Sequence, residues 1–278
     1  MKKLLVIGDV IDDIIVVPET EIRTNTDTNA TIQQTLGGSA SNVASWAANQ
    51  KADVTFVGCI SRTDIERVTK QFELYGVKTD LQASDKNTGS LVVIVEGANR
   101  SMLTDRGANQ DLNLEAISED QLATYKYVYL SGYSILNKTV DQVQSFITKV
   151  HNAGSTLIVD PGSTGFIRDY GIHKFKEAIQ KVDILLPNEE EFELIGALAQ
   201  TTLVTKAAQG VDLYMEGVLT ESFDAPKVQS IDPTGAGDSF AGGLLAGLCT
   251  GLEMRNAITA GINCAAMAVT TIGARPRL

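Results

Sequence analysis

The chain is poor in the residues that most often carry metal or nucleophilic chemistry. Its 278 residues include only two histidines, His151 and His173, and three cysteines, Cys59, Cys249 and Cys264. The cysteines lie far apart without a CxxC pair, and both histidines lie in polar stretches typical of a surface. This scarcity argues against a zinc enzyme and a Ser-His-Asp hydrolase, and it fits a reducing, cytoplasmic setting.

Positive charge and long apolar runs are also scarce. Lys and Arg total 23 against 34 Asp and Glu, which gives a net charge of -11 at pH 7. A surface this acidic argues against nucleic acid or an anionic membrane as partner. No apolar run reaches the length of a membrane span, and residues 3–7 are soon followed by Asp9, so they indicate a buried strand rather than a signal peptide. We therefore expect a cytoplasmic protein with no nucleic-acid or membrane partner.

Apolar residues, in contrast, make up 44% of the chain, enough for one sizeable core. Short apolar runs of strand type alternate with amphipathic stretches of helical type, which predicts an α/β fold with helices on both faces of a parallel sheet. The predicted strands are residues 3–7, 54–58, 127–130, 156–159, 183–186, 202–205 and 211–215. The predicted helices are residues 41–50, 64–75, 118–125, 140–152 and 175–181.

Two segments depart from this alternation. Residues 13–36 have no helical period, and residues 88–104 are prone to β structure around an apolar centre at 91–95. Together they predict a small antiparallel sheet, with lid segments at about 14–36 and 88–105, that covers a site or forms a dimer surface. The centre at 91–95 also fits one more core strand. No linker marks a second independent domain, so residues 1–278 are expected to form one domain.

The most informative motif is Asp-Pro-Thr-Gly-Ala-Gly-Asp at residues 232–238. It follows a strand-like run at 228–231 and precedes a small-residue, apolar run at 242–252 that predicts a buried helix. A glycine-rich turn at a helix N-terminus presents amides and a positive dipole end, which favour an anion. Asp238 would repel a phosphate there, so it makes more sense as a base for an attacking hydroxyl. The alternative is that Asp238 only stabilises the helix start.

A second motif begins with two glycines, Gly37 and Gly38, before another small-residue helix. Ser39 or Ser41 is available as its cap. Asn42 offers both a donor and an acceptor, which suits the hydroxyls of a sugar or polyol. The alternative is a tightly packed helix start that binds no ligand.

A third motif, at residues 185–191, places Asn188 at the end of a strand and Glu191 in the first turn of the next helix. Acidic side chains at a helix start ordinarily only complement the helix dipole. At the carboxyl end of a parallel strand, the same Asn and Glu can hold Mg²⁺-bound water near a phosphate.

In this order and spacing the three motifs resemble the ribokinase-like (PfkB) carbohydrate kinase family, and the resemblance covers almost the whole chain. It implies a Rossmann-like three-layer α/β/α domain with a small β-sheet lid. It also implies transfer of the γ-phosphoryl group of ATP to a hydroxyl of a sugar or sugar-like acceptor, with Mg²⁺, with K⁺ as a candidate cofactor, and with a homodimer through the lid. A nucleoside kinase of the same family and a non-catalytic sugar- or nucleotide-binding protein stay open as rivals.

Carried over position by position, the resemblance implies a role for each site residue. Asp238 is the base, and the amides of Gly235, Ala236 and Gly237 form the anion hole. The acceptor would be held by Asp13, Gly38, Asn42 and Arg106, and the nucleotide by Asn188, Thr205, Gly210, Gly237 and Asn263. Glu191 would help to organise Mg²⁺, and Asp232 and Thr234 would help to form the monovalent-cation site.

The chain departs from the family pattern at several positions. Ile11 stands where the family frequently has Asn, and Ser39 stands where ribokinases often have Lys, which weakens ribose as the substrate. Ala207 falls where the nucleotide loop usually has Gly, so its Cβ is expected to crowd that loop. Arg106 is either a partner for a phosphate or carboxylate on the acceptor or a surface residue in a turn. Residues 160–162 are either a strand-end turn or a pocket wall.

Overall fold

The computed structural model describes residues 2–96 and 99–278. Its main feature is a nine-stranded sheet in which seven neighbouring strands run parallel and an antiparallel hairpin of two more strands is added at one edge. The strand order is β13 (Val218–Phe223), β12 (Val211–Met215), β11 (Thr201–Thr205), β10 (Ile184–Leu185), β9 (Thr156–Asp160), β8 (Tyr127–Ser131), β1 (Lys3–Ile7), β4 (Asp53–Ser61) and β5 (Lys78–Ser84).

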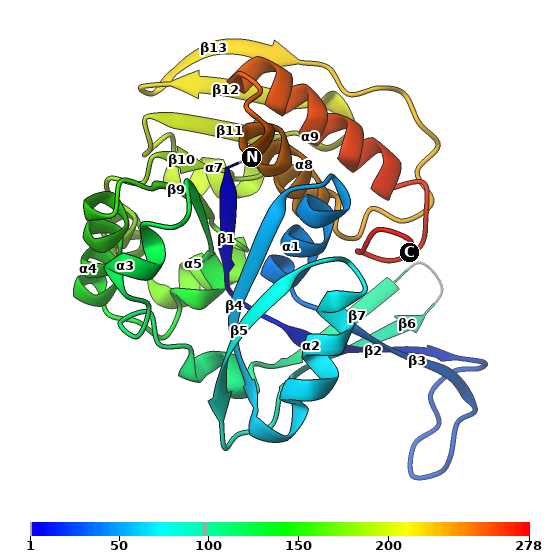
Figure 1. Cartoon of the computed structure of the whole chain (residues 1–278). Coiled ribbons are helices and arrows are strands. Elements are labelled where there is room, and N and C mark those ends of the chain that lie inside the picture. Colours follow the sequence, from blue (N-terminus) through cyan, green and yellow to red (C-terminus); the bar gives the residue numbers. More distant parts are fainter. Residues whose placement is uncertain (1, 97–98) are drawn as a thin grey trace.

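Helices cover both faces of this main sheet (Figure 1). One face carries α1 (Ser39–Asn49), α2 (Ile65–Glu73), α8 (Ala236–Thr250) and α9 (Met254–Ala268). The other carries α3 (Glu119–Leu122), α4 (Val140–Asn152), α5 (Thr164–Tyr170), α6 (Ile172–Ala178) and α7 (Glu189–Ile195). Along β1, Leu4 and Val6 pack into the first core while Leu5 and Ile7 pack into the second, as strand alternation requires. The expected three-layer α/β/α fold is confirmed.

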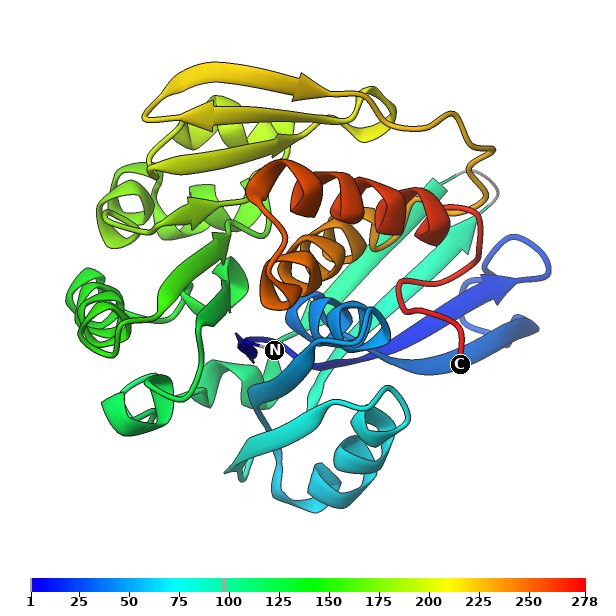
Figure 2. The same cartoon turned by 45° about the horizontal axis from the view of Figure 1, so that its top comes forward.

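A second, small sheet projects from the main domain (Figures 1 and 2). Its four strands lie in the order β3 (Ala30–Gly37), β2 (Ile11–Pro18), β6 (Gly89–Glu96) and β7 (Asn99–Asp105), so the two irregular segments of the sequence do pair. The outer pairs are antiparallel, but the central strands β2 and β6 run parallel. The prediction of an antiparallel sheet was wrong here because β2 follows β1 and β6 follows β5, and those two strands point the same way.

Most of the predicted elements are present, and β1 and α4 have the predicted bounds. Residues 228–231 are not a strand; the Ile231 amide donates instead to the Val269 carbonyl at 2.7 Å, beyond the end of α9. Helix α3 is a single turn because the amides of Thr124 and Tyr125 bond three residues back, which tightens and ends the helix. Further 3-10 turns lie at Arg62–Asp64, Gly107–Asp111, Gly132–Ser134 and Ala207–Gln209.

Helix α8 is the most deeply packed helix near the site, and it lies between α1 and α9 (Figure 2). Two glycines make this packing close. A Cβ on Gly242 would lie 2.5 Å from the Cβ of Trp46 on α1, and one on Gly243 would lie 2.6 Å from the sulfur of Cys264 on α9. The small-residue composition of α8 therefore fixes its N-terminus against α1.

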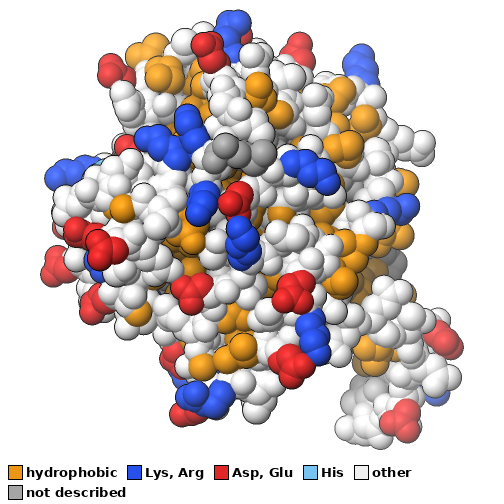
Figure 3. All heavy atoms as spheres, viewed as in Figure 1, with side chains coloured by type: hydrophobic (Ala, Val, Ile, Leu, Met, Phe, Trp, Pro, Cys, Tyr) orange, Lys and Arg blue, Asp and Glu red, His pale blue; other side chains and the backbone are white. Residues whose placement is uncertain are grey.

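The surface agrees with a chain of mixed charge. On the face in Figure 3, Lys and Arg side chains alternate with Asp and Glu, and neither sign gathers into a large patch. None of the described helices combines the length and the apolar character needed to cross a bilayer.

Candidate active site

A cleft of about 630 Å³ lies where the small sheet, the carboxyl ends of main-sheet strands and the N-terminus of α8 meet. Most of the site residues expected from the sequence line it. They are Asp13, Gly38, Asn42, Arg106, Asn188, Glu191, Thr205, Thr234, Gly235, Ala236, Gly237 and Asp238. Gly210, Asp232 and Asn263 are not among the residues of its wall.

Asp238, in the first turn of α8, is held by α1. Its two carboxylate oxygens accept hydrogen bonds from the hydroxyl of Ser39 and from the side-chain nitrogen of Asn42, each at 2.8 Å. Asp238 therefore does not cap its own helix, which argues against a purely local role. Burial raises the pKa of the Asp238 carboxyl to about 6; the bonds from Asn42 and Ser39 hold it down, and the charge of Asp9 adds to the rise.

Asp9 fixes the start of α1. The N-cap residue, Gly38, makes no side-chain cap, and neither Ser39 nor Ser41 acts as one, so that expectation was wrong. The carboxylate of Asp9 takes the role, accepting from the Ser39 amide at 2.9 Å, the Ala40 amide at 3.4 Å and the Ser131 hydroxyl at 3.0 Å. Because Asp9, in the loop after β1, supplies the cap, the Ser39 hydroxyl is left to donate to Asp238.

The turn before α8 is open toward the cleft. Gly235 has a left-handed φ of 76°, and a Cβ there would lie 2.6 Å from that of Ala274. Gly237 is exposed, with no atom within 4 Å of where a Cβ would be. Its amide donates to no acceptor in the described part of the chain. An open helix N-terminus with a spare amide is suited to an anion.

Asn188 and Glu191 form a reciprocal cap at the start of α7. The Glu191 carboxylate accepts from the amide nitrogen of Asn188 at 3.0 Å and from its side chain at 2.8 Å, while Asn188 accepts from the Glu191 amide at 2.9 Å. The pair thus fulfils the ordinary structural role that its spacing allows. Both residues also line the cleft. Burial raises the pKa of Glu191 above its usual range, against the bonds from Asn188.

Asp13 enters the cleft from β2. Its Oδ1 is buried without a hydrogen-bond partner among the described residues. Burial raises the pKa of Asp13 to about 7; Arg275 opposes the rise, and Asp9, Asp12 and Asp238 add to it. The neighbouring Asp12 points the other way and receives both terminal nitrogens of Arg67, at 2.9 and 2.8 Å. Asp13 is therefore left available to a ligand.

This geometry matches a known family. Residues 1–278 match the model of the pfkB family of carbohydrate kinases. The chain belongs to this family. As a family member it is an ATP-dependent phosphotransferase that uses an alcohol group as acceptor, which confirms the interpretation of the three motifs.

Individual relatives are distant. The ATP-dependent ribose-1-phosphate kinase of Halopiger xanaduensis is 25% identical over 87% of this chain and 83% of its own. The adenosine kinase of Saccharomyces cerevisiae is 24% identical over 95% of this chain and 83% of its own. A solved structure of a putative ribokinase II from E. coli with ATP and Mg²⁺ superposes with a TM-score of 0.80 at 20% identity, over 99% of this chain and 94% of its own. At that identity the superposition supports the fold.

Three residues carried over from the family lie away from the cleft wall. Asp232 is buried and joins two loops, accepting from the amide and hydroxyl of Thr234 on one oxygen and from the Gly273 amide on the other. Gly210 has a φ of 102°, and a Cβ there would meet the Phe223 carbonyl oxygen at 1.9 Å, so backbone geometry explains the glycine. Asn263 is exposed on α9.

Arg275 is a site residue that the motifs missed. Its Nε donates to the Asn42 side-chain oxygen at 3.3 Å, its terminal nitrogen contacts the Ser41 hydroxyl, and its guanidinium lies 5.5 Å from the rings of Phe72 and Tyr75. Arg275 therefore orients Asn42, which in turn holds Asp238. Asp9 was missed for the same reason, since both act over long sequence separations. A buried polar residue directly after a strand is the only local signal for Asp9.

Residues 160–162 form part of the pocket wall. Asp160 and Gly162 both line the cleft, and the Gly162 amide donates to the Asp160 carboxylate at 2.9 Å. Burial raises the pKa of Asp160 well above its usual range, and the charges of Glu191 and Asp238 add to the rise. The cleft is acidic throughout: its carboxylates are Asp9, Asp13, Asp160, Glu191 and Asp238.

Proposed function

We propose that Asp238 is the general base of phosphoryl transfer to a sugar hydroxyl. The acceptor hydroxyl donates its proton to the carboxylate as its oxygen attacks the γ-phosphorus in line. The observation that carries this proposal is the pair of hydrogen bonds from Ser39 and Asn42, which hold the Asp238 carboxylate in the first turn of α8. A pKa of about 6 leaves the carboxylate ionised at neutral pH yet basic enough to take the proton.

The turn at Gly235, Ala236 and Gly237 is proposed to bind the transferred phosphoryl group. The exposed Gly237 and its spare amide leave room for close approach of an anion. A helix dipole aimed at this point stabilises the charge that develops during transfer. Asn188 and Thr205, joined in a backbone bridge, lie on the wall of the same cleft and are proposed to contact the nucleotide, together with Gly210 and Asn263.

The residues present fit Mg²⁺ held through water. Among the described residues no three carboxylates, histidines or cysteines gather into a cage that could hold a metal. Mg²⁺ suits this arrangement, since it keeps several waters and needs only one or two carboxylates beside substrate phosphates. Glu191 and Asp160 are those carboxylates in the cleft, and the bonds from Asn188 keep Glu191 in place. Bound there, the metal would neutralise phosphate charge.

For the acceptor, Asp13 is proposed as the main hydroxyl partner. Its buried Oδ1 has no partner among the described residues, and a ligand hydroxyl would supply the missing donor. Asn42 contributes more by position than by contact, because its amide already bonds Asp238 and its oxygen already accepts from Arg275. Gly38 keeps the approach open at the start of α1, where its φ of 98° requires a glycine.

A sugar is favoured over a nucleoside as the acceptor. A nucleoside kinase needs a face on which the base can stack. The aromatic residues of the cleft wall are Tyr133, Phe166 and Phe240. Phe240 is 3% exposed, and the other two rings are both covered by the guanidinium of Arg106, at 4.3 and 4.2 Å.

Two finer points are proposed with the kinase activity. Asp232 and Thr234, which tie the loop before α8 to Gly273, are proposed to help bind K⁺. The face of the small sheet turned away from the cleft is proposed as a homodimer surface, because it carries Ile32 and Leu103, 65% and 61% exposed. The K⁺ site is tested by measuring activity after K⁺ is replaced by tetramethylammonium. The homodimer is tested by analytical ultracentrifugation. We place the enzyme in the cytoplasm.

The decisive test is release of ADP from Mg·ATP with a panel of sugars, sugar phosphates, sugar acids and nucleosides. Wild type is compared with Asp238→Asn and with Asp85→Asn, an exposed aspartate that pairs with Arg62 on the surface. Release by wild type and Asp85→Asn, but not by Asp238→Asn, supports the assignment. Near-normal release by Asp238→Asn would refute Asp238 as the base.

A further inference from the structure

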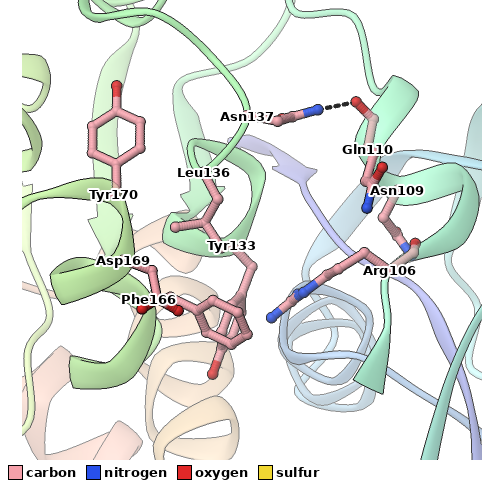
Figure 4. Close-up of a pocket in the computed structure, with 9 residues that line it drawn as sticks. All are labelled: Arg106, Asn109, Gln110, Tyr133, Leu136, Asn137, Phe166, Asp169 and Tyr170. Atoms are coloured by element: carbon pink, nitrogen blue, oxygen red, sulfur yellow. Dashed lines mark hydrogen bonds between the residues drawn. The ribbon is translucent and has the colours of Figure 1, made fainter. Parts of the chain in front are cut away.

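The side chain of Arg106 points toward two aromatic rings, those of Tyr133 and Phe166, on the wall of the cleft (Figure 4). Its guanidinium carbon is 4.3 Å from the ring centre of Tyr133 and 4.2 Å from that of Phe166. The two rings are themselves 5.3 Å apart in an edge-to-face arrangement. Cation–π contact with both rings holds the guanidinium in place without using its N–H groups.

These N–H groups are unused in the part of the chain that the structure describes. Arg106 makes no ion pair there, and its Nε is buried with no hydrogen-bond acceptor. Arg67 provides a contrast, because both of its terminal nitrogens donate to the carboxylate of Asp12. A buried, charged donor without an acceptor is costly, so the site is incomplete without a ligand.

The loop around Arg106 is itself well held. The side-chain oxygen of Asn109 accepts from the Val10 amide at 3.0 Å, and its nitrogen donates to the carbonyls of Val10 and Arg106 at 2.9 and 3.1 Å. The hydroxyl of Tyr133 donates to the Gly162 carbonyl at 2.9 Å, which anchors one of the two rings that Arg106 contacts. The guanidinium is thus presented on a fixed scaffold rather than on a free surface turn.

The wall of the cleft carries several carboxylates and a single basic side chain among its described residues. Arg106 is the only Lys or Arg on the described wall of the cleft, whose other charged residues are the five carboxylates named above. Among the described residues, it is also the only basic one on the wall of an adjoining cavity of about 320 Å³, and Asp169 is the only carboxylate there. An acceptor that presents a hydroxyl to Asp238 and an anionic group to Arg106 would match both kinds of charge.

We propose that the acceptor is an anionic sugar, with a phosphate or carboxylate group that is bound by the guanidinium of Arg106. This inference rests on the proposed kinase function and names the substrate class for the same site. The planar guanidinium can form two parallel N–H···O bonds to either anion. A neutral acceptor could offer the guanidinium only uncharged oxygens, which form weaker hydrogen bonds, so the anionic group provides selectivity against it.

The first test measures kcat/KM for matched acceptors: fructose against fructose 1-phosphate and fructose 6-phosphate, and ribose against ribose 1-phosphate and ribonate. The variants are Arg106→Gln, Arg106→Lys and Arg168→Gln, the last an exposed arginine of α5 outside both cavities. We expect wild type and Arg168→Gln to prefer an anionic member about 10- to 100-fold, as a charged hydrogen bond allows. Arg106→Gln should lose that preference, and Arg106→Lys should retain part of it.

The phosphate and carboxylate arms separate the two anion types. The inference would be overturned if wild type preferred the neutral sugars, fructose and ribose. It would also be overturned if Arg106→Gln kept the preference for anionic acceptors. Either result would leave the kinase function intact. If no acceptor is phosphorylated, calorimetry with fructose 1-phosphate, ribonate and inorganic phosphate decides. Heat of binding for at least one anion with wild type but not with Arg106→Gln supports the anion site even if the kinase function fails. Equal heat, or none, overturns the inference.

Discussion

The hydroxyl of Ser39 on α1 donates a hydrogen bond of 2.8 Å to Asp238 on α8, across a sequence separation of 199 residues. Ser39 is itself placed by Asp9 on the other side, through its amide. The orientation of the proposed base therefore depends on a chain of hydrogen bonds from Asp9, in the loop after β1, through Ser39 in the first turn of α1. These hydrogen bonds, rather than the Gly-rich turn alone, set the direction of the carboxylate.

Asp238→Asn should abolish transfer without unfolding the protein. We expect kcat to fall by about 10²- to 10⁴-fold, the usual contribution of a general base, with ATP affinity nearly unchanged. Stability gives a second readout. The folded pKa is above that of an unfolded aspartate, so this group lowers the stability of the fold progressively from about pH 4 to about pH 6, and the full penalty applies above that. The variant should therefore gain Tm relative to wild type at pH 8, and the gain should shrink toward pH 3, where the carboxyl is protonated in both the folded and the unfolded state. An equal change in Tm at both pH values would contradict this origin.

The pH profile should report the same carboxyl group. Because the base must be ionised, kcat/KM should rise with pH through about 6 and level off above it. Ser39→Ala removes a hydrogen bond that favours the charged form, so its rising limb should move to higher pH. Thr63→Ala, which removes a hydroxyl bonded only to Ser61, is the control and should keep the wild-type midpoint. An unmoved limb in Ser39→Ala would separate Asp238 from the observed titration.

Asp9→Ala should cost both stability and activity. It removes the acceptor for two α1 amides and the Ser131 hydroxyl, so the free energy of unfolding should fall by about 1–2 kcal/mol, the range for a lost helix cap. Asp9→Asn keeps one oxygen acceptor and should lose less. Urea unfolding measures the loss, with Asp85→Ala as an exposed control. Unchanged stability in Asp9→Ala would show that water replaces this cap.

Ala207→Gly should stabilise the protein by up to about 1 kcal/mol, because a Cβ is unfavourable in the left-handed region. The sequence led us to expect that the Cβ of Ala207 crowds the nucleotide loop. In the structure the φ of Ala207 is 48° and the residue is exposed, so the unfavourable feature is backbone strain. Ala208→Gly, in the same exposed turn but outside the left-handed region, should instead destabilise by about 0.4–1 kcal/mol through unfolded-state entropy. Urea unfolding of both variants checks the pair. Loss of stability in both would show that no strain is stored at Ala207.

The sequence was informative where local pattern determines structure. Alternating apolar runs determine which strands are buried, and a Gly-rich turn before a small-residue helix determines where an anion can approach. Hence the main sheet, α8 and the position of Asp238 were predictable from the residues themselves. The same holds for Asn188 and Glu191, whose spacing directly encodes the reciprocal cap that the structure contains.

Features that depend on distant partners were not predictable. Asp9 caps α1 from the loop after β1, and Arg275 reaches Asn42 across 233 residues, so no local period marks either contact. The parallel pairing of β2 with β6 likewise depends on how the main sheet orients the strands before them. Residues 228–231 have strand-like composition, but they bond to the loop after α9 and not to a strand edge. Amino-acid composition does not show whether a sheet edge is available for such a segment to pair with.

The long separation between the partners of Asp238 has a kinetic consequence. Ser39 and Asn42 are 199 and 196 residues away along the chain, and Arg275 contacts Asn42 from still farther. Contacts of such separation form only after the intervening chain has been ordered, since loop closure opposes them until other contacts compensate. The catalytic constellation is therefore expected to assemble late during refolding. Enzyme activity should return more slowly than the far-ultraviolet signal of the helices and sheet.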